Sequence, residues 1–191
     1  MKRYIKSAVK DVLDEPEDIR YDLGFDQNTR PEILERLASS QDYYTRCAVA
    51  RNPNTPVELL QKLAKDLNKN VRTDVADNPN TPEDILRILA KDSDVVVRRY
   101  VSRNPNTPVD VLRKFFDDPE ILYTDLARNP NCPQDKMMEI AENCYDHPFI
   151  QDDLLRNPNV TLDAVRYIAQ HGAHSVKHIA EQKLQEMGEE L

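Results

Sequence analysis

The chain reads Asn-Pro-Asn-Thr-Pro at residues 52–56, 78–82 and 104–108. Two degenerate copies follow, Asn-Pro-Asn-Cys-Pro at 129–133 and Asn-Pro-Asn-Val-Thr at 157–161. Successive copies begin 26, 26, 25 and 28 residues apart. A recurring period of this length is typical of stacked structural repeats. It predicts an array in which each copy is one supersecondary unit, instead of one globular core.

Each motif predicts the start of a helix. In the copy at 52–56, Thr55 can cap the helix, Pro56 suits the first helical position, and Glu58 can close a capping box. From such a cap we expect a helix of roughly ten residues. Its apolar residues recur at the i, i+1, i+4, i+5 spacing of one buried stripe. The stripe is present as Ile33, Leu34, Leu37 and Ala38; Leu59, Leu60, Leu63 and Ala64; Ile85, Leu86, Leu89 and Ala90; and Val111, Leu112, Phe115 and Phe116.

A second, shorter apolar pattern completes each repeat. It appears as Val71, Val75 and Ala76 and again as Val97 and Val101, and the next Asn-Pro pair follows it. Because proline disfavours a helical conformation in the residue before it, each of these asparagines should be extended and end the helix. The sequence therefore predicts an all-α solenoid of short paired helices, with α/α or α/3₁₀ repeats of about 26 residues.

The apolar positions at the two ends indicate capping elements. One helical face near the start carries Tyr4, Ile5, Ala8, Val9, Val12 and Leu13. In the tail, a charged face lies opposite Val176, Ile179, Ala180, Leu184 and Met187. Terminal repeats need a polar outer face to stay soluble. We therefore expect one solenoid over 1–191, with N-terminal capping helices in 1–25, repeats in 26–172 and a C-terminal capping helix in 173–191.

Composition limits the classes of partner and compartment. The 191 residues carry a formal net charge of -8, which argues against a general nucleic-acid binder. Three cysteines without short paired spacing give no disulfide framework and favour a reducing compartment. The N-terminal residues contain no apolar stretch long enough for a signal peptide or membrane span. We expect a cytoplasmic protein without a membrane segment.

Motifs for catalysis, cofactors and metals are absent from the sequence. Its 3 glycines form no phosphate-binding loop. Cys47 fits a small buried position of the repeat better than a reactive thiol. His174 and His178 have the i, i+4 spacing of a metal-binding pair, but no second ligand pair accompanies them, which favours a solvated helix face. We expect a protein that is not an enzyme and has no cofactor or metal site.

The segment 71–90, Val-Arg-x-x-Val-Ala-x-Asn-Pro-Asn-Thr-Pro-x-x-Ile-Leu-x-x-Leu-Ala, resembles the leucine-rich repeat variant family of bacterial proteins. The resemblance extends over residues 19–182. It implies α-helices that alternate with 3₁₀ helices in a right-handed superhelix, or with short α-helices. One family member binds an iron–sulfur cluster through cysteines of a separate N-terminal module, but Cys47, Cys132 and Cys144 lie in different repeats here, so no cluster ligand is transferred.

A first column of arginines recurs once per repeat, at Arg20, Arg46, Arg72 and Arg98. Asp66 and Asp92 each lie six residues before an arginine, a spacing that also resembles HEAT repeats and implies a protein-binding use. We expect these four residues, Asp66, Arg72, Asp92 and Arg98, to form a structural ladder between neighbouring repeats. The alternative is a row of guanidinium groups that binds phosphates, which the nearby carboxylates should neutralise.

A second column immediately precedes each Asn-Pro pair: Arg51, Asp77, Arg103, Arg128 and Arg156. A cation at the end of a helix interacts with the negative end of its dipole, which is the structural interpretation. The functional one is a partner-binding stripe, because Arg99 and Tyr100 share a helix with Arg103 and these residue types are enriched at interface hot spots. The candidate partner-binding residues are therefore Arg51, Arg99, Tyr100, Arg103, Arg128 and Arg156.

The repeated asparagines, such as Asn52 and Asn54, should satisfy their own turns, although they could hydrogen-bond a bound peptide. Together these patterns predict a non-enzymatic scaffold that mediates protein–protein interaction through the ridge of short helices. The alternative function is nucleic-acid or phosphate binding through the arginine columns.

Overall fold

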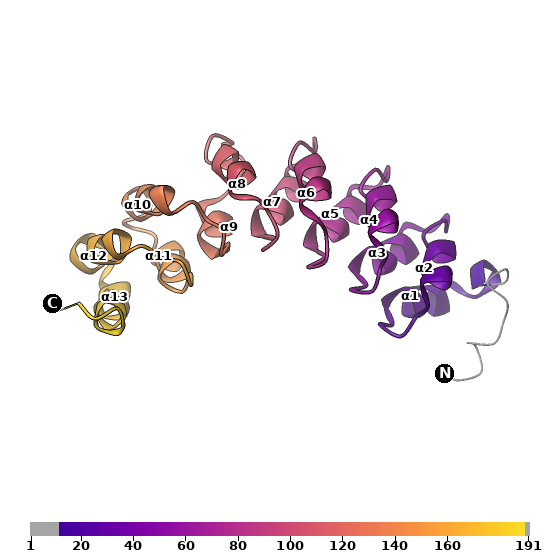
Figure 1. Ribbon diagram of the computed structural model, residues 1–191, viewed down its shortest axis with the longest axis horizontal. Coiled ribbons are helices and arrows are strands. Elements are labelled where there is room, and N and C mark those ends of the chain that lie inside the picture. Colours follow the sequence, from indigo (N-terminus) through magenta and orange to yellow (C-terminus); the bar gives the residue numbers. More distant parts are fainter. Residues whose placement is uncertain (1–11, 190–191) are drawn as a thin grey trace. The chain divides into compact units, whose positions relative to one another are not determined.

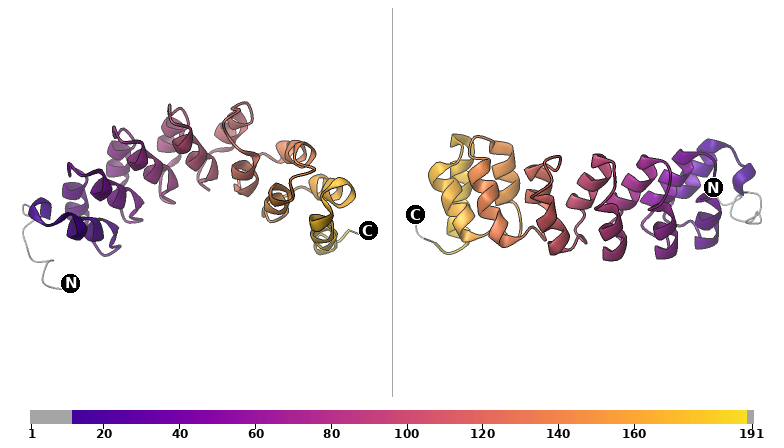
Figure 2. Two further views of the ribbon diagram at one scale, coloured as in Figure 1. Left: turned by 180° about the vertical axis from the view of Figure 1, so that it is seen from behind. Right: turned by 90° about the horizontal axis from the view of Figure 1, so that it is seen from above.

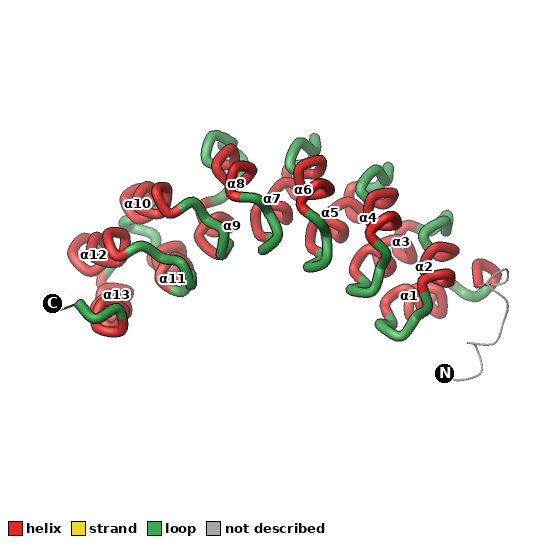
Figure 3. The backbone as a smooth tube through the Cα atoms, viewed as in Figure 1, coloured by secondary structure: helices red, strands yellow, loops and turns green. Residues whose placement is uncertain are grey.

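The computed structural model describes residues 12–189, which form thirteen α-helices and one 3₁₀ helix. Within this range all other segments are turns or loops, and no β-strand is present (Figure 3). The prediction of an all-α fold is confirmed for these residues. Of the expected N-terminal apolar face, Tyr4, Ile5, Ala8 and Val9 lie outside the described residues. Val12 and Leu13 belong to the 3₁₀ helix Val12–Asp14, in which Val12 is buried.

Backbone contacts divide the chain into two compact units, 1–106 and 107–191. Unit 1 contains the 3₁₀ helix η2 (Val12–Asp14) and the helices α1 (Glu17–Phe25), α2 (Pro31–Leu37), α3 (Tyr43–Arg51), α4 (Val57–Leu63), α5 (Lys69–Asp77), α6 (Glu83–Leu89) and α7 (Val95–Arg103). Within this unit α1, α3, α5 and α7 follow one another in one row, and α2, α4 and α6 form a second row (Figure 1). Contacts between successive helices are most extensive in the first row.

Unit 2 contains α8 (Val109–Phe115), α9 (Tyr123–Arg128), α10 (Gln134–Asn143), α11 (Pro148–Leu155), α12 (Leu162–His171) and α13 (His174–Glu186). Helix α11 packs against both α9 and α13, while α12 packs against α10 and α13, and these helices lie close together in the views of Figure 2. Helix α13 occupies the segment in which a C-terminal capping helix is expected; its capping role stays a prediction.

The first helix of each repeat begins one residue later than expected. In unit 1 it is also shorter than the roughly ten residues expected from the sequence. Helices α4 and α6 have seven residues each, with Pro56 and Pro82 at their N-caps in non-helical conformations. The predicted capping role of Thr55 is wrong, because no side chain caps α4 and the Thr55 hydroxyl instead donates to the Val49 carbonyl at 2.5 Å. The threonine therefore closes the end of the preceding helix.

The second helix of each repeat is a nine-residue α-helix in α3, α5 and α7. It is longer than the first helix, the reverse of the order expected. Its N-cap comes from Asp42 or Asp94 or from Asn68, whose side-chain oxygens accept backbone N–H groups of the first turn. It ends at an asparagine in the extended conformation, as the following proline predicts; Asn78 has φ -67° and ψ 122°.

The predicted apolar stripes form the core. Leu60 and Leu86 are inaccessible to solvent, as are Val71, Val75 and Val101 of the facing helices. Each helix is too short to be stable alone in water. The burial of both stripes between neighbouring repeats therefore supplies the main stabilisation.

Asparagine side chains join successive repeats. Asn78 donates its Nδ2 to the carbonyls of Ala50 and Asn52, one repeat earlier, at 2.7 and 3.0 Å. Its Oδ1 accepts the N–H of Asn80 at 2.9 Å. Asn52, Asn104 and Asn157 make the equivalent bonds to their preceding repeats. The amide oxygen thus satisfies its own turn, as expected, while the amide nitrogen makes an inter-repeat bond that the sequence analysis missed.

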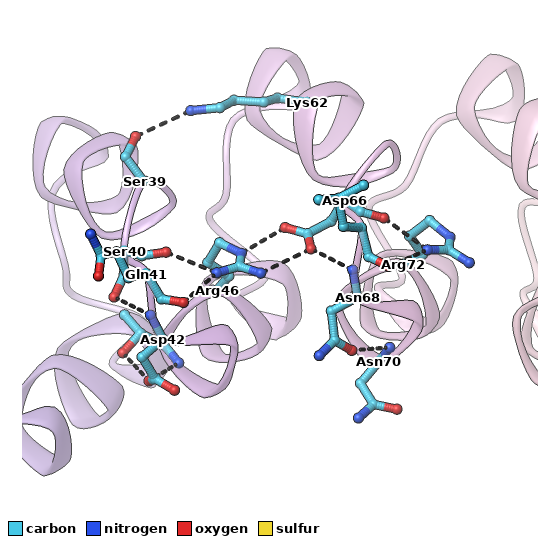
Figure 4. A network of polar contacts seen from close by, with 12 residues as sticks. Ser39, Ser40, Gln41, Asp42, Arg46, Lys62, Asp66, Asn68, Asn70 and Arg72 are labelled. Carbon is cyan, nitrogen blue, oxygen red and sulfur yellow. Dashed lines mark hydrogen bonds and ion pairs between the residues drawn. The ribbon is translucent and has the colours of Figure 1, made fainter.

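Arginine and aspartate side chains form a second inter-repeat contact in unit 1 (Figure 4). Arg46 donates Nε and Nη2 to the two carboxylate oxygens of Asp66 at 2.6 and 3.0 Å. Arg72 makes the same two bonds to Asp92 at 2.6 and 2.9 Å. The structure therefore joins Arg72 to the aspartate of the following repeat, whereas its bond to Asp66 runs from Nη1 to the backbone carbonyl, at 2.8 Å. Arg98 likewise donates to the Asp92 carbonyl at 2.9 Å.

This geometry predicts an energetic coupling between Arg72 and Asp92. We expect alanine substitutions of the two residues to be less than additive by about 1–2 kcal/mol, because both remove one two-point, largely buried ion pair. Denaturant unfolding of the two single variants and the double variant measures it. The matched cycle of Arg72→Ala with Asp66→Ala should give a smaller coupling, since the backbone carbonyl survives the second change.

Acidification provides an independent check on that coupling. Burial alone would raise the pKa of the Asp92 carboxyl, but hydrogen bonds from Arg72 and the Asp94 N–H hold this pKa below its usual 3.8. A lowered folded-state pKa means that the stabilisation is present above the unfolded pKa and declines as the pH falls through the folded value. Coupling that is unchanged well below pH 3.8, or absent at neutral pH, would contradict the ladder contact.

Candidate functional site

A groove lies on the row of α1, α3, α5 and α7 in unit 1. Its volume is about 410 Å³. Four of its lining residues are tyrosines, Tyr21 on α1, Tyr43 and Tyr44 on α3, and Tyr100 on α7. The remaining lining residues come from α3, α5 and α7 and are Cys47, Arg51, Asn70, Thr73, Asp74 and Val96. All the described helices of one row in this unit thus contribute to a single concave surface.

The groove-lining positions change from repeat to repeat, unlike the positions that hold the repeats together. Positions 44, 70 and 96 are one repeat apart and carry Tyr44, Asn70 and Val96. Positions 74 and 100 carry Asp74 and Tyr100. Two of the inter-repeat contacts instead use the same donor residue in successive repeats, arginine at 46 and 72 and asparagine at 52, 78 and 104. Packing demands the same residue in each unit, so the varied positions are those available to recognise a ligand.

Exposure and ring contacts make this surface suited to binding. Tyr44 has 59% of its surface exposed and its ring lies against that of Tyr43, with 4.1 Å between the ring centroids. The Arg51 side chain is 50% exposed. Tyrosine and arginine bury large areas at interfaces and still offer hydrogen-bond donors.

Arg51 is oriented by the buried carboxylate of Asp74. Its Nε donates to Asp74 Oδ1 at 2.7 Å, across the boundary between two repeats. Burial raises the pKa of Asp74, and hydrogen bonds from Cys47 and Arg51 offset part of this effect. One edge of the guanidinium is thereby held in place, while half of the side chain remains accessible.

The predicted partner-binding residues fall into two groups. Arg51 and Tyr100 both line the groove of unit 1, and Arg99 and Arg103 belong to the same helix as Tyr100. The Arg103 guanidinium lies 5.5 Å from the centroid of the Tyr100 ring, within range of a cation–π interaction.

Arg128 and Arg156 belong to unit 2, where both face aspartates of α11. Arg128 Nε lies 2.9 Å from Asp153 Oδ1, and Arg156 Nε lies 2.8 Å from Asp152 Oδ2. Arg51, Arg128 and Arg156 thus each face a carboxylate, and so do Arg46 and Arg72 in the first column. These pairings lower the positive charge that the columns offer to phosphates.

Sequence reasoning missed three tyrosines of the groove, Tyr21, Tyr43 and Tyr44. Tyr44 and Tyr21 occupy different positions within their repeats, so they form no column. The sequence signal for this surface was the presence of tyrosines on the helices that precede the Asn-Pro pairs, α3 and α7, and on α1 before the first repeat. These tyrosines indicate a common surface only once α1, α3, α5 and α7 are known to lie in one row.

The thiols are buried and protonated. Burial raises the pKa of Cys47 and that of Cys132 to about 12, and that of Cys144 to about 11. Among residues 12–189 no group of three or more histidine, cysteine or acidic side chains is arranged to hold a metal ion. Over the same residues, none of the helices combines the length and apolar character that a membrane span requires.

Comparisons of the chain with models of known protein families, with curated proteins and with solved structures gave no match.

Proposed function

We propose that the protein is a non-enzymatic helical-repeat scaffold that binds a segment of a protein partner in the groove of unit 1. The observation that carries the proposal is the convergence of Tyr21, Tyr43, Tyr44 and Tyr100 with the half-exposed Arg51 on one surface. These residue types supply most of the binding energy in many interfaces. The groove runs across several helices of one row, which suits a chain segment better than a small compact ligand.

We further propose that the repeats form a right-handed solenoid of the leucine-rich repeat variant or HEAT-like type. The recurring asparagine bonds and the Arg46–Asp66 and Arg72–Asp92 pairs support this architecture, because each joins a repeat to its neighbour in the same way. The nine-residue helices of unit 1 favour α/α repeats. The three free, buried cysteines are in keeping with a reducing compartment such as the cytoplasm.

Arg99, Arg103, Arg128 and Arg156 are further candidate contacts for the partner. The Arg128 and Arg156 side chains are 59% and 72% exposed, so their guanidinium groups can donate to a partner while an aspartate holds Nε. Nucleic-acid binding has less support, because the paired carboxylates compensate the arginine charge and the chain carries a net charge of -8.

The test is to select peptides from a random displayed library against the full chain and to measure their affinity for variants. We expect Tyr44→Ala to weaken binding about tenfold, the cost of removing an exposed aromatic contact of roughly 1.4 kcal/mol. The matched control is Tyr145→Ala, because Tyr145 is a tyrosine of unit 2 with a similar exposure, 58% against 59%.

Equal affinities of the wild type and Tyr44→Ala for every selected peptide would refute the groove as the binding site. Binding of a DNA duplex or an RNA strand that weakens steeply with salt and survives Tyr44→Ala would instead favour the arginine columns. Thermal unfolding of both variants should match that of the wild type, since both side chains are largely exposed.

A further inference from the structure

Arg20 interrupts the pattern of paired arginines in unit 1. It lies one repeat before Arg46 and two before Arg72 in the same column. All three side chains are buried to the same degree, with exposed fractions of 16%, 17% and 16%. Arg46 and Arg72 each direct two donors at a carboxylate of the next repeat. Arg20 has no such partner, because the corresponding position holds Ser40 instead of an aspartate.

The contacts that Arg20 makes leave part of its guanidinium unsatisfied. Nη1 donates to the Leu13 carbonyl at 2.8 Å. Nη2 lies 3.8 Å from a carboxylate oxygen of Glu17, whose side chain is 78% exposed, so this ion pair is weak. Nε is buried and has no hydrogen-bond partner, although Nε is the atom through which Arg46 and Arg72 make their shortest bonds. A buried donor without an acceptor is costly, so the site favours a ligand that supplies one.

The space that an aspartate would fill is open. Ser40 is shorter, and its hydroxyl accepts the Asp42 N–H at 3.2 Å. A hollow of about 700 Å³ lies here, lined by Arg20, Ser40, Gln41 and Tyr43 among others. The equivalent hollow one repeat later, which includes Arg46 and its partner Asp66, has about 480 Å³. The missing carboxylate therefore coincides with a larger cavity and with an unpaired donor.

We propose that Arg20 binds a carboxylate supplied from outside the chain, which takes the place that Asp66 and Asp92 hold in the following repeats. The planar guanidinium matches the two oxygens of a carboxylate. Glu17 and Asp42 also line the hollow, so a singly charged carboxylate is repelled less than a phosphate dianion. Tyr43 lines both this hollow and the tyrosine groove. An acidic residue of a polypeptide in the groove can therefore reach Arg20, but the carboxylate site itself does not depend on the proposed function.

The test compares the wild type with Ser40→Asp, which restores the ladder residue. Thermal midpoints are measured for the full chain in sodium acetate and in sodium chloride at equal ionic strength. Acetate should raise the midpoint of the wild type relative to chloride, because a ligand of the folded state stabilises it. Ser40→Asp should start higher by roughly 3–6 °C and show no difference between the two salts.

Two controls keep the result specific. Ser175→Asp places the same charge on an exposed serine of α13 in unit 2, which does not line the hollow, and should keep the acetate response of the wild type. Arg20→Gln removes the guanidinium and should abolish the acetate response. This variant therefore tests the proposal even if Ser40→Asp fails to fold. An acetate response of equal size in the wild type, Ser40→Asp and Arg20→Gln would overturn the proposal, as would a thermal midpoint for Ser40→Asp below that of the wild type.

The source of the carboxylate is distinguished by a peptide arm. Acetyl-Gly-Glu-Gly-amide and its glutamine counterpart are titrated into the wild type beside acetate. A glutamyl peptide that binds about tenfold more tightly than acetate, while the glutamine peptide does not bind, assigns the site to acidic polypeptides. Similar affinities for the glutamyl peptide and acetate assign it to small carboxylates. Tight binding of both peptides, without a contribution from the carboxylate, would contradict the proposal.

Discussion

Leu86→Ala should lower the free energy of unfolding by about 2–5 kcal/mol, the cost of lost apolar burial together with the cavity that the smaller side chain leaves. Leu86 lies in the middle of α6 and is inaccessible to solvent, as are Ile85 beside it and Val75 and Val101 of the neighbouring helices. Because every described helix of unit 1 has nine or fewer residues, the helices contribute little stability by themselves. The stability of the unit therefore depends on the packed stripe.

The same helix offers a matched control for this prediction. Ile88 is also apolar, but 46% of its surface is exposed, so Ile88→Ala should cost less than about 1 kcal/mol. Denaturant unfolding followed by far-ultraviolet circular dichroism measures both variants. A loss for Leu86→Ala no larger than that for Ile88→Ala would show that the stripe is not the core of the repeat.

The positions that pack in every repeat were predictable from the sequence. The stripe of α6 and the extended asparagines follow from local rules, the spacing of apolar residues on a helix and the effect of proline on the preceding residue. Their periodic recurrence made the same inference possible several times along the chain. The all-α fold and the buried positions could therefore be predicted without any knowledge of how the repeats contact one another.

Contacts between repeats could not be assigned in the same way. The spacing of Asp66 and Arg72 suggested a side-chain pair, yet Arg72 binds the carboxylate of Asp92, 20 residues away, and only the carbonyl of Asp66. A hydroxyl can donate as well as accept, so the Thr55 motif was equally compatible with an N-cap and with the bond to Val49 that forms. The direction of each bond depends on the distance between repeats, which the local sequence does not contain.

The candidate groove was the least predictable feature, because its residues do not recur. Tyr44, Asn70 and Val96 occupy the same position in successive repeats but differ in type. They therefore form no recurring column of the kind that indicated Arg51 and Arg103 as candidate binding residues. Arg20 shows the opposite case. The column was evident from the sequence, and only the structure revealed that one member lacks the carboxylate that its two successors bind.

Asn78→Ala should lower the free energy of unfolding by about 2 kcal/mol, because it removes three hydrogen bonds of one buried side chain, two of which join neighbouring repeats. The Asn78 side chain is 2% exposed, and its amide bridges the carbonyls of Ala50 and Asn52 while accepting the N–H of Asn80. Removal of the amide takes the Nδ2 bond from the Ala50 carbonyl and takes one of two bonds from the Asn52 carbonyl, which also accepts the Thr55 N–H. The N–H of Asn80, an exposed residue, loses its acceptor as well.

Asn78→Asp separates the two functions of that side chain. The carboxylate retains an acceptor for the Asn80 N–H but has no hydrogen to donate, and it faces the carbonyl oxygens of Ala50 and Asn52. We therefore expect a destabilisation at neutral pH at least as large as that of Asn78→Ala. The control is Asn80→Ala, whose amide bonds Pro53 at an exposed position and should contribute less than about 1 kcal/mol. If Asn78→Asp unfolds at the same denaturant concentration as the wild type, the amide nitrogen does not join the repeats, and their stacking depends on apolar contacts and the arginine–aspartate pairs alone.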